Sequence, residues 1–393
     1  MLIGLVGKPN VGKSTFFKAA TASEVLIANY PFATIKPNHG VGYVQIECID
    51  KEFNTQCHPR YGFCINHQRF VPIDLMDVAG LVPGASEGKG LGNQFLDNLR
   101  EADAFIQIVD ASGTTDIEGR TTENHDIIQD VQFLEKELDL WYVNLMQKVW
   151  KTFARKVEQE KSQIGASIAK QFSGLKITED HVKEVLRKAN LPEKIAQWSE
   201  QEIYTFAHKL RELTKPMIIA ANKADHPNSK ANITKLQEQF PNIKITPCAA
   251  DAELALREAT KAGLIEYVPG SSTFKIIKEV NERQKAALDK IQNEILNVYG
   301  NTGVQNILNY SVFDLLKKIA IFPAGANKLG DSKGNILPDC FLLQEGATAL
   351  DFAYHLHTDL GNNFIKAIDA RTKQARGKEY LLKHRDALEI VTK

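Results

Sequence analysis

The hydrophobic positions of the chain fall into short unbroken runs that alternate with longer stretches of helical spacing. Residues 2–6 form the first run, and four later runs each end in polar or small residues, at 69–80, 102–112, 215–225 and 242–250. Unbroken apolar runs of this length are typical of parallel strands that are buried on both faces. The alternation predicts a doubly wound α/β sheet, in which ligands bind at the carboxyl ends of the strands.

A long helical pattern interrupts the predicted sheet over residues 124–213. Apolar side chains recur every three or four residues over 126–157 without Pro or Gly, and the same spacing returns at 179–191 and 199–213. This pattern predicts a helical domain inserted between two strands of the sheet. Residues 148–188 hold ten Lys or Arg against five Asp or Glu. The insertion therefore has either an ordinary solvated face or a surface that faces RNA.

A third pattern begins after residue 316. Short apolar runs around one amphipathic helix predict a small α+β module, with strands at 319–324, 339–344, 363–370 and 386–393 and the helix at 348–360. We therefore expect three domains, namely a sheet domain at 1–123 and 214–316, an inserted helical domain at 124–213 and the C-terminal module at 317–393.

Composition narrows the kinds of partner. The chain has 393 residues with 48 Lys and Arg against 48 Asp and Glu, so it lacks the basic excess of a protein whose main partner is DNA. Its hydrophobic content of 43% is ordinary for a globular protein, and no apolar run reaches the roughly 18 residues that cross a membrane. We expect a cytoplasmic protein that neither enters a membrane nor binds DNA.

The cysteines leave one alternative open. Their number, five, is odd and argues against a disulfide framework. Cys48, Cys57 and Cys64 lie close together in the sequence, with His58 and His67 nearby. The spacing lacks the paired C-x-x-C of a zinc knuckle, so it favours a loop or hairpin with reduced thiols. Metal binding that involves Cys57, Cys64 and His67 is the alternative.

The first apolar run leads into a glycine-rich loop and then a helix. Residues 7–14 read GKPNVGKS. In the order strand, loop, helix this pattern is a P-loop, whose backbone N–H groups surround a phosphate. Its Lys bridges the β- and γ-phosphates, and its Ser hydroxyl binds Mg²⁺. The predicted nucleotide-binding residues of the loop are Asn10, Val11, Gly12, Lys13, Ser14 and Thr15.

Two later motifs extend this site. Asp77 ends an apolar run and is predicted to act at the Mg²⁺, while Gly80 offers an N–H to the γ-phosphate. Asn222, Lys223 and Asp225 follow another run. A carboxylate at Asp225 accepts from N1–H and N2–H of guanine, which adenine does not offer, so the motif favours guanine. Lys223 is expected to pack its stem over the base. Backbone N–H groups of Ala249 and Ala250 are candidates for guanine O6, with Ala250 preferred.

Four stretches of the chain together resemble those of the Obg-like GTPases, in particular the YchF-type branch of archaea and eukaryotes. They are GKPNVGKST, NYPFATIKPNHG, DVAGLVPGASEGKGLGNQFL and NKAD. The resemblance covers essentially the whole chain. It implies a Ras-like P-loop domain, a helical insertion and a C-terminal TGS domain with a β-grasp fold. It also implies that Thr34 closes over Mg²⁺ and the γ-phosphate, and that the TGS domain contacts RNA or a ribosome. The basic residues considered for that contact are Lys366, Arg371, Lys373, Arg376 and Lys378.

The residue after the γ-phosphate motif is Leu81, where Ras-like enzymes place a Gln that positions the attacking water. A Leu forms no hydrogen bond to water, so we expect slow intrinsic turnover unless another group positions it. In several related GTPases a P-loop Asn binds a K⁺ that takes the place of an arginine finger. Asn10 is therefore a candidate K⁺ ligand, and the alternative is that it caps the loop. The glycine-rich residues 84–93 are expected to form the second switch.

These expectations describe an enzyme that hydrolyses GTP to GDP and phosphate and acts as a switch on a ribosome, tRNA or other RNA. An ATPase of the YchF kind is one alternative, because that branch often departs from the guanine motif and prefers ATP. A regulatory module that binds nucleotide with negligible turnover is another. The predicted catalytic residues are Lys13, Thr34, Gly80 and Asn10, and the predicted Mg²⁺ ligands are Ser14, Thr34 and Asp77.

Overall fold

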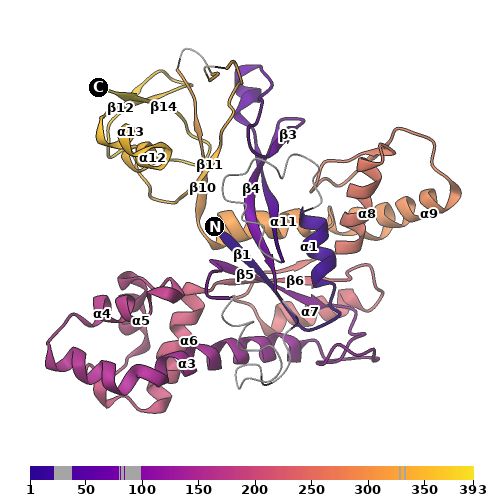
Figure 1. Ribbon diagram of the computed structural model, residues 1–393. Coiled ribbons are helices and arrows are strands. Elements are labelled where there is room, and N and C mark those ends of the chain that lie inside the picture. Colours follow the sequence, from indigo (N-terminus) through magenta and orange to yellow (C-terminus); the bar gives the residue numbers. More distant parts are fainter. Residues whose placement is uncertain (22–37, 79, 81–83, 85–98, 327–328, 332) are drawn as a thin grey trace. The chain divides into compact units, whose positions relative to one another are not determined.

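The computed structural model describes the chain except for residues 22–37, 79, 81–83, 85–98, 327–328 and 332 (Figure 1). Leaving those residues aside, the chain forms two compact units. The first contains Met1–Ala22, Lys36–Gly40 and Asp74–Ile307, and the second contains Val41–Ile73 and Leu308–Lys393. Val41–Ile73 thus belong to the same compact unit as Leu308–Lys393. The three predicted domains stay a proposal.

The largest sheet of the described residues is mainly parallel. The strand order is β2-β4-β1-β5-β6-β7, and β1, β4, β5, β6 and β7 run parallel. Every residue of β5 is buried, as expected for a central strand covered on both faces. The predicted α/β fold is therefore confirmed. The strands are β1 Leu2–Val6, β2 His39–Glu47, β3 Phe63–Ile65, β4 Gln68–Asp77, β5 Ala104–Asp110, β6 Met217–Asn222 and β7 Ile245–Pro247.

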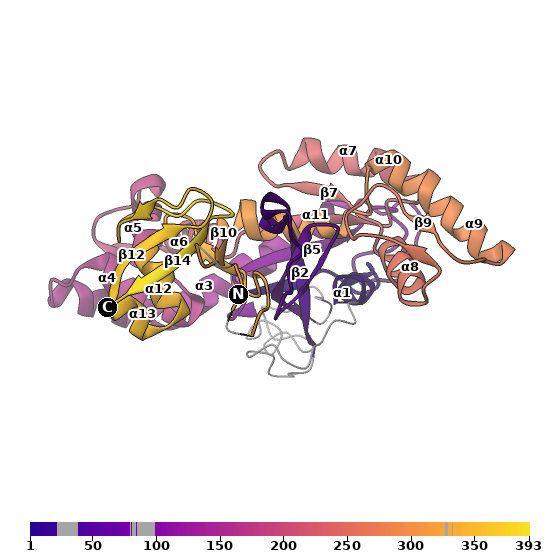
Figure 2. The ribbon, with the colours of Figure 1, turned by 90° about the horizontal axis from the view of Figure 1, so that it is seen from above.

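Strand register brings the polar residues that follow the strands to one edge of the sheet. Leu5 in β1 pairs with Asp77 in β4, and Asp110 in β5 pairs with Asn222 in β6. Helices α1 and α8 lie side by side (Figure 2). The remaining elements here are α1 Lys13–Thr21, α7 Ser229–Gln239, α8 Ala250–Lys261, β8 Ile265–Glu266, β9 Lys275–Ile276, α9 Glu282–Lys290, a π-helical turn Ile291–Leu296, α10 Asn297–Tyr299 and α11 Val304–Asn309.

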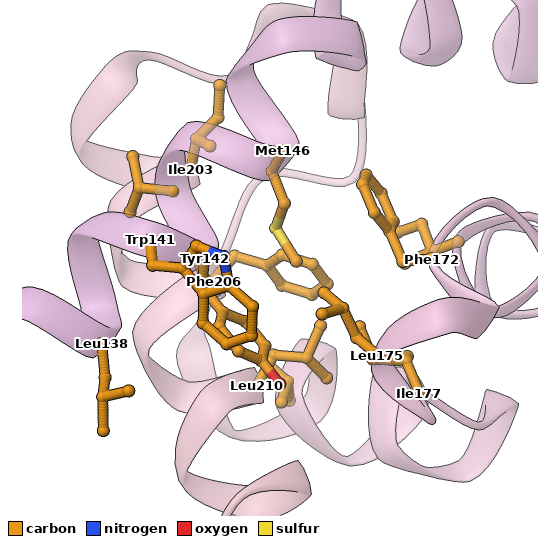
Figure 3. Packing of buried hydrophobic residues seen from close by; sticks show 14 of the residues in the cluster. Leu138, Trp141, Tyr142, Met146, Phe172, Leu175, Ile177, Ile203, Phe206 and Leu210 are labelled. Carbon is orange, nitrogen blue, oxygen red and sulfur yellow. The ribbon is translucent and has the colours of Figure 1, made fainter. Parts of the chain in front are cut away.

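The inserted residues form a helical layer around an aromatic core (Figure 3). Trp150 and Trp198 stack with ring centroids 5.2 Å apart, and Phe206 packs against both. The same buried cluster continues to Val6 and Phe105 of the sheet, so the insertion packs on the sheet. The helices are α3 Ile128–Gln159, α4 Ile164–Gln171, α5 Glu179–Ala189 and α6 Glu200–Thr214, with 3₁₀ turns at Ser173–Leu175 and Ile195–Gln197.

A buried ion-pair group links α3 to α6. Asp139 is 4% exposed and accepts hydrogen bonds from Nε of Arg211 and Nδ1 of His208, both at 2.8 Å. The hydrogen bond to Asp139 raises the pKa of His208, against burial and the nearby Arg211, and Glu212 acts in the same direction as Asp139. Protonated His208 therefore stabilises the fold of the insertion.

We expect this group to make the stability of the insertion depend on pH. Because the pKa of His208 is raised in the folded state, its contribution is complete below the ordinary value of 6.5 and is lost as the pH rises through the folded value. The imidazole is 35% exposed, so we expect a loss of less than about 1 kcal/mol. All three Trp residues lie in the insertion, so Trp fluorescence during thermal unfolding reports this domain. His208→Gln should flatten the difference between mildly acidic and mildly alkaline pH, and an unchanged difference would contradict the assignment.

The C-terminal module carries a five-stranded sheet in the order β11-β10-β14-β12-β13. The predicted helix is divided at His357, whose extended backbone ends one helix and whose ring accepts from the N–H of Asp359 to cap the next. The short strand β13 escaped prediction because it has only two residues in a polar stretch. The elements are a π-helical turn Tyr310–Leu315, β10 Lys318–Pro323, β11 Phe341–Gln344, α12 Ala349–Leu356, α13 Thr358–Asn362, β12 Phe364–Asp369, β13 Ala375–Arg376 and β14 Ala387–Thr392.

Candidate nucleotide-binding site

The loop between β1 and α1 has a backbone that requires glycine at two positions. Gly7 has φ 153° and a Cβ there would lie 2.6 Å from the carbonyl oxygen of Ile108. Gly12 has φ 90°, and its Cβ would lie 2.2 Å from Nδ2 of Asn222. The helix begins at Lys13, so the N–H groups of its first turn have no partner within the helix and face the loop. Such a loop followed by a helix N-terminus suits a phosphate.

Lys13, Ser14 and Asp77 meet at the start of α1. The Ser14 hydroxyl donates to Oδ2 of Asp77 at 2.9 Å, and Nζ of Lys13 lies 3.3 Å from Oδ1 of the same carboxylate. Oδ1 is buried and accepts no hydrogen bond from the described residues. A hydroxyl and a carboxylate are the oxygen ligands that Mg²⁺ prefers. These residues therefore fit a magnesium ion together with the phosphates that it accompanies.

Gly80 lies directly against the phosphate loop. A Cβ at Gly80 would come within 2.9 Å of Cγ and 3.0 Å of the backbone nitrogen of Pro9, so only glycine allows this approach. Gly80 thus lies against the phosphate loop, and its donation to a γ-phosphate stays a prediction. Thr34, Leu81 and most of the predicted switch at 84–93 lie outside the described residues. Within that segment, Gly84 donates its N–H to Oε1 of Glu137 in α3 at 2.8 Å.

Asn222 connects the phosphate loop to the loops that follow β6 and β7. Its side chain is 3% exposed and donates from Nδ2 to the carbonyl of Val11 at 2.9 Å. Its Oδ1 accepts from the N–H of Ala250 at 3.1 Å, while the N–H of Ala249 donates to the carbonyl of Thr302 at 2.9 Å. Both predicted donors to guanine O6 are thus engaged within the protein. Donation from Ala250 to a base requires its hydrogen bond to Asn222 to be exchanged.

Asp110 anchors Lys223, a contact that the sequence analysis missed. Asp110 is fully buried and accepts from Nζ of Lys223 at 2.8 Å and from the hydroxyl of Thr115 at 2.9 Å. Burial alone would raise the pKa of Asp110, but hydrogen bonds from Lys223, Ser112 and Thr115 hold it below its ordinary value. The Lys223 stem is thereby held in one position. The only sequence signal for Asp110 is its place as a polar residue at the end of an apolar run.

Asp225 follows Lys223 at the surface, with an exposed side chain. The preceding residue is fixed, because the N–H of Ala224 donates to the carbonyl of Cys248 at 2.9 Å. The hydroxyl of Tyr299 donates to the carbonyl of Ala224 at 3.3 Å, and burial together with the Asp225 charge raises the pKa of Tyr299. The Asp225 carboxylate is therefore accessible and close to an aromatic ring, which suits contact with a base.

Residues that follow β5 contact the phosphate loop, and no sequence pattern predicted these contacts. Lys8 is 3% exposed, and its Nζ lies 2.7 Å from Oδ2 of Asp130 and 2.7 Å from the carbonyl of Thr115. Nδ2 of Asn10 donates to the carbonyl of Gly119 at 2.9 Å. Gly119 itself has φ 83° and approaches Pro9 so closely that a Cβ would lie 2.7 Å from its carbonyl oxygen. These contacts hold Lys8, Pro9 and Asn10 of the phosphate loop in place.

A parallel sheet with this loop, this carboxylate and this base-contact motif at one edge defines a P-loop nucleotide-binding protein. Three family models match the chain in agreement with that class. They describe a 50S ribosome-binding GTPase at residues 2–144, the G4 motif-containing domain of YGR210-like Obg-like GTPases at 220–325 and a TGS domain at 326–392.

Full-length relatives specify the family. An uncharacterized GTP-binding protein of Methanocaldococcus jannaschii is 49% identical over 100% of this chain and 99% of its own length. An uncharacterized GTP-binding protein of Schizosaccharomyces pombe is 37% identical over 89% of this chain and 88% of its own length. The chain therefore belongs to the Obg-like GTPases related to YchF, and it ends in a TGS domain.

Solved structures agree with this assignment. A GTP-binding protein from Pyrococcus horikoshii OT3 shares 39% identity, with a TM-score of 0.81 and full coverage of both chains. The YchF GTPase of Schizosaccharomyces pombe shares the fold, with 22% identity, a TM-score of 0.60 and coverage of 100% of this chain and 97% of that one. Among the described residues, no helix has the length and apolar content to cross a bilayer.

Proposed function

We propose that this protein binds GTP and hydrolyses it to GDP and phosphate. The observation that carries the proposal is the buried Asn222 side chain, which joins the phosphate loop at Val11 to the loop at Ala250. Asn222 lies three residues before Asp225. The arrangement therefore supports a nucleotide whose phosphates bind the phosphate loop and whose base binds Asp225. Guanine is favoured because the accessible Asp225 carboxylate accepts two hydrogen bonds that adenine lacks the donors for.

The proposed roles of the phosphate-binding residues follow from charge. Lys13 and the N–H groups of residues 10–15 bind the phosphate oxygens and stabilise negative charge that develops as the γ-phosphoryl group leaves. The backbone N–H of Gly80 holds the γ-phosphate in line with an attacking water. Bound Mg²⁺ would neutralise phosphate charge, with Ser14, Asp77 and Thr34 as the residues proposed to hold it. Lys223 and its partner Asp110 orient the base.

An ATPase of the YchF kind is the second candidate. It is favoured by the name of a Bacillus subtilis relative, a ribosome-binding ATPase YchF that is 33% identical over 93% of this chain and 87% of its own length. Competition between GTP and ATP for the Mg²⁺-loaded protein separates the two candidates. Tighter binding and faster turnover of GTP supports our proposal, and a preference for ATP overturns it.

We further propose that the protein acts as a switch on the ribosome or on RNA, through the helical insertion and the TGS domain. The relatives' names and the model of a 50S ribosome-binding GTPase motivate this. Of the basic TGS residues, Arg371 pairs with Glu52 and Arg376 with Asp369, whereas Lys366 and Lys378 are exposed. Co-sedimentation with ribosomes in GTP, GDP and a non-hydrolysable analogue tests the proposal. Equal association in all three, with no stimulation of hydrolysis, would favour a nucleotide-binding module without a switch.

Potassium activation follows from the position of Asn10. Its Nδ2 donates to Gly119, which leaves Oδ1 as an acceptor on an exposed side chain beside the phosphate loop. We expect K⁺ to accelerate GTP hydrolysis by about tenfold over Na⁺, which corresponds to about 1.4 kcal/mol of transition-state stabilisation. Asn10→Ala should abolish the difference between the two salts.

The control for this variant is Asn190→Ala. Asn10 and Asn190 both have positive φ, 62° and 49°, so each Ala variant carries a similar backbone strain. Asn190→Ala, which lies in the helical insertion, should keep the K⁺ effect. Equal hydrolysis rates of the unaltered protein in K⁺ and Na⁺ would refute the potassium proposal.

A further inference from the structure

Three thiols and a carboxylate converge within the second compact unit. Cys48 directly follows β2, Asp50 lies in the 3₁₀ turn Ile49–Phe53, Cys57 lies in the following loop and Cys64 lies in β3. One ligand atom of each of the four residues lies within 4.8 Å of the others. Cys48 and Asp50 are fully buried, Cys57 is 3% exposed and Cys64 is half-buried, so protein covers most of the group.

The distances match a tetrahedral metal site. Sγ of Cys48 lies 3.6 Å from Sγ of Cys57, and Sγ of Cys64 lies 3.8 Å from Oδ2 of Asp50. A tetrahedral zinc ion with Zn–S bonds of about 2.3 Å separates two sulfurs by about 3.8 Å and a sulfur from an oxygen by about 3.5 Å. A disulfide joins its sulfurs at about 2.05 Å, so the observed separation corresponds to thiols that face a common centre.

Neighbouring groups orient the four residues and supply positive charge. Nδ1 of His67 lies 2.9 Å from Oδ1 of Asp50, and the N–H of Cys57 donates to Oδ2 at 3.0 Å. Arg69 is only 1% exposed and directs a guanidinium nitrogen at Sγ of Cys57, 3.6 Å away. A buried cation needs negative charge nearby. The carboxylates of Asp50 and Asp339 supply part of it, and thiolates bound to a metal would add to it.

We propose that Cys48, Asp50, Cys57 and Cys64 bind one zinc ion in a closed structural site. Three thiolate sulfurs select a soft or borderline metal over Mg²⁺ or Ca²⁺, and four protein ligands in tetrahedral arrangement suit Zn²⁺. His67 holds the carboxylate in position through its other oxygen, as partners of metal ligands commonly do. The ligand set thus contains Asp50 in place of the His67 considered from the sequence.

The zinc ion would hold a loop that binds the C-terminal module of the same unit. Glu52 lies between the first two cysteines and pairs with Nη2 of Arg385 at 2.6 Å. Arg60 lies between the second and third cysteines and pairs with Asp339 at 3.4 Å. Arg69 donates to the carbonyl of Pro338 at 2.8 Å. Because the metal ties together the ends of this loop, its removal should loosen the contacts to the module.

Metal analysis of the full chain, purified under reducing conditions after growth with added Zn²⁺, tests the site directly. We expect about one zinc per chain by elemental mass spectrometry, and Cys64→Ala should reduce it about tenfold, since metal sites that lose a ligand bind far more weakly. The matched control is Cys248→Ala, which removes a buried cysteine of the first unit and should keep the zinc. Replacement of Zn²⁺ by Co²⁺ should give the visible absorption of a tetrahedral cobalt thiolate.

Limited trypsin digestion gives a second readout that does not depend on a variant. Lys51 and Arg60 lie in the loop and have side chains that are 64% and 48% exposed. A chelator should accelerate cleavage after these residues in the unaltered protein, and Zn²⁺ should reverse the effect. A chain purified without zinc, zinc retained in Cys64→Ala, or a Cys48–Cys57 disulfide found by mass spectrometry would each overturn the proposal. None of these outcomes bears on GTP hydrolysis.

Discussion

Gly12→Ala should lower the affinity for GTP by about 100-fold. A Cβ at this position would lie 2.2 Å from Nδ2 of Asn222, so the amide must move. Its movement breaks the hydrogen bonds to Val11 and Ala250 and separates the phosphate loop from the loop after β7. Loss of two buried hydrogen bonds and of the geometry they impose costs about 3 kcal/mol, which equals about 100-fold in affinity. Titration with a fluorescent GTP analogue measures the effect.

Gly300→Ala is the matched control for this variant. Gly300 also has a left-handed backbone, with φ 80°, but a Cβ there would meet nothing within 4 Å. It therefore carries the backbone strain of about 1 kcal/mol without displacing any group. We expect Gly300→Ala to bind GTP normally. Equal GTP affinities of the two variants would show that displacement of Asn222 is not what lowers the affinity in Gly12→Ala.

Asp225→Asn should exchange the preference for guanine for a preference for xanthine. The carboxylate accepts from N1–H and N2–H of guanine, whereas an amide offers a donor that suits the O2 carbonyl of xanthine. Loss of two charge-assisted hydrogen bonds costs about 3 kcal/mol, so we expect GTP to bind about 100-fold more weakly and XTP to bind more tightly than in the unaltered protein. Competition of GTP, XTP and ATP against one labelled nucleotide measures all three affinities.

Asp251→Asn controls for the loss of one negative charge. Asp251 is exposed in the first turn of α8 and belongs to the same unit as Asp225. It should leave the affinities for all three nucleotides unchanged. An Asp225→Asn protein that keeps its GTP affinity would contradict base recognition by Asp225. If it also keeps a strong affinity for ATP, the ATPase alternative gains support.

Much of the candidate site was accessible from the sequence because its chemistry is local. Gly12, Lys13 and Ser14 are adjacent, and the strand, loop and helix that present them are all encoded within about twenty residues, so hydropathy and glycine placement suffice. Asp77 was predicted by the same reasoning, as the polar end of a buried strand. The structure then placed its carboxylate 2.9 Å from the Ser14 hydroxyl.

Such patterns could not predict contacts between segments that are far apart in the sequence. Asp110 pairs with Lys223 because β5 and β6 are neighbours in register, and strand order is not encoded in either strand alone. The salt bridge of Lys8 with Asp130 likewise depends on where the insertion leaves the sheet. For the cysteines, linear spacing argued against a metal, since their proximity in space depends on β2 and β3 both lying beside β4.

The sequence by itself determined the class of this protein, the helical insertion and the residues proposed to contact phosphate and base. Those features depend on side-chain periodicity and on motifs whose members are close along the chain. Only the tertiary structure decided that Asn222 joins the two halves of the nucleotide site and that Asp50, not His67, completes the group of three thiols. Both depend on strand pairing and loop packing. These bring together residues whose distance in space cannot be predicted from their separation along the chain.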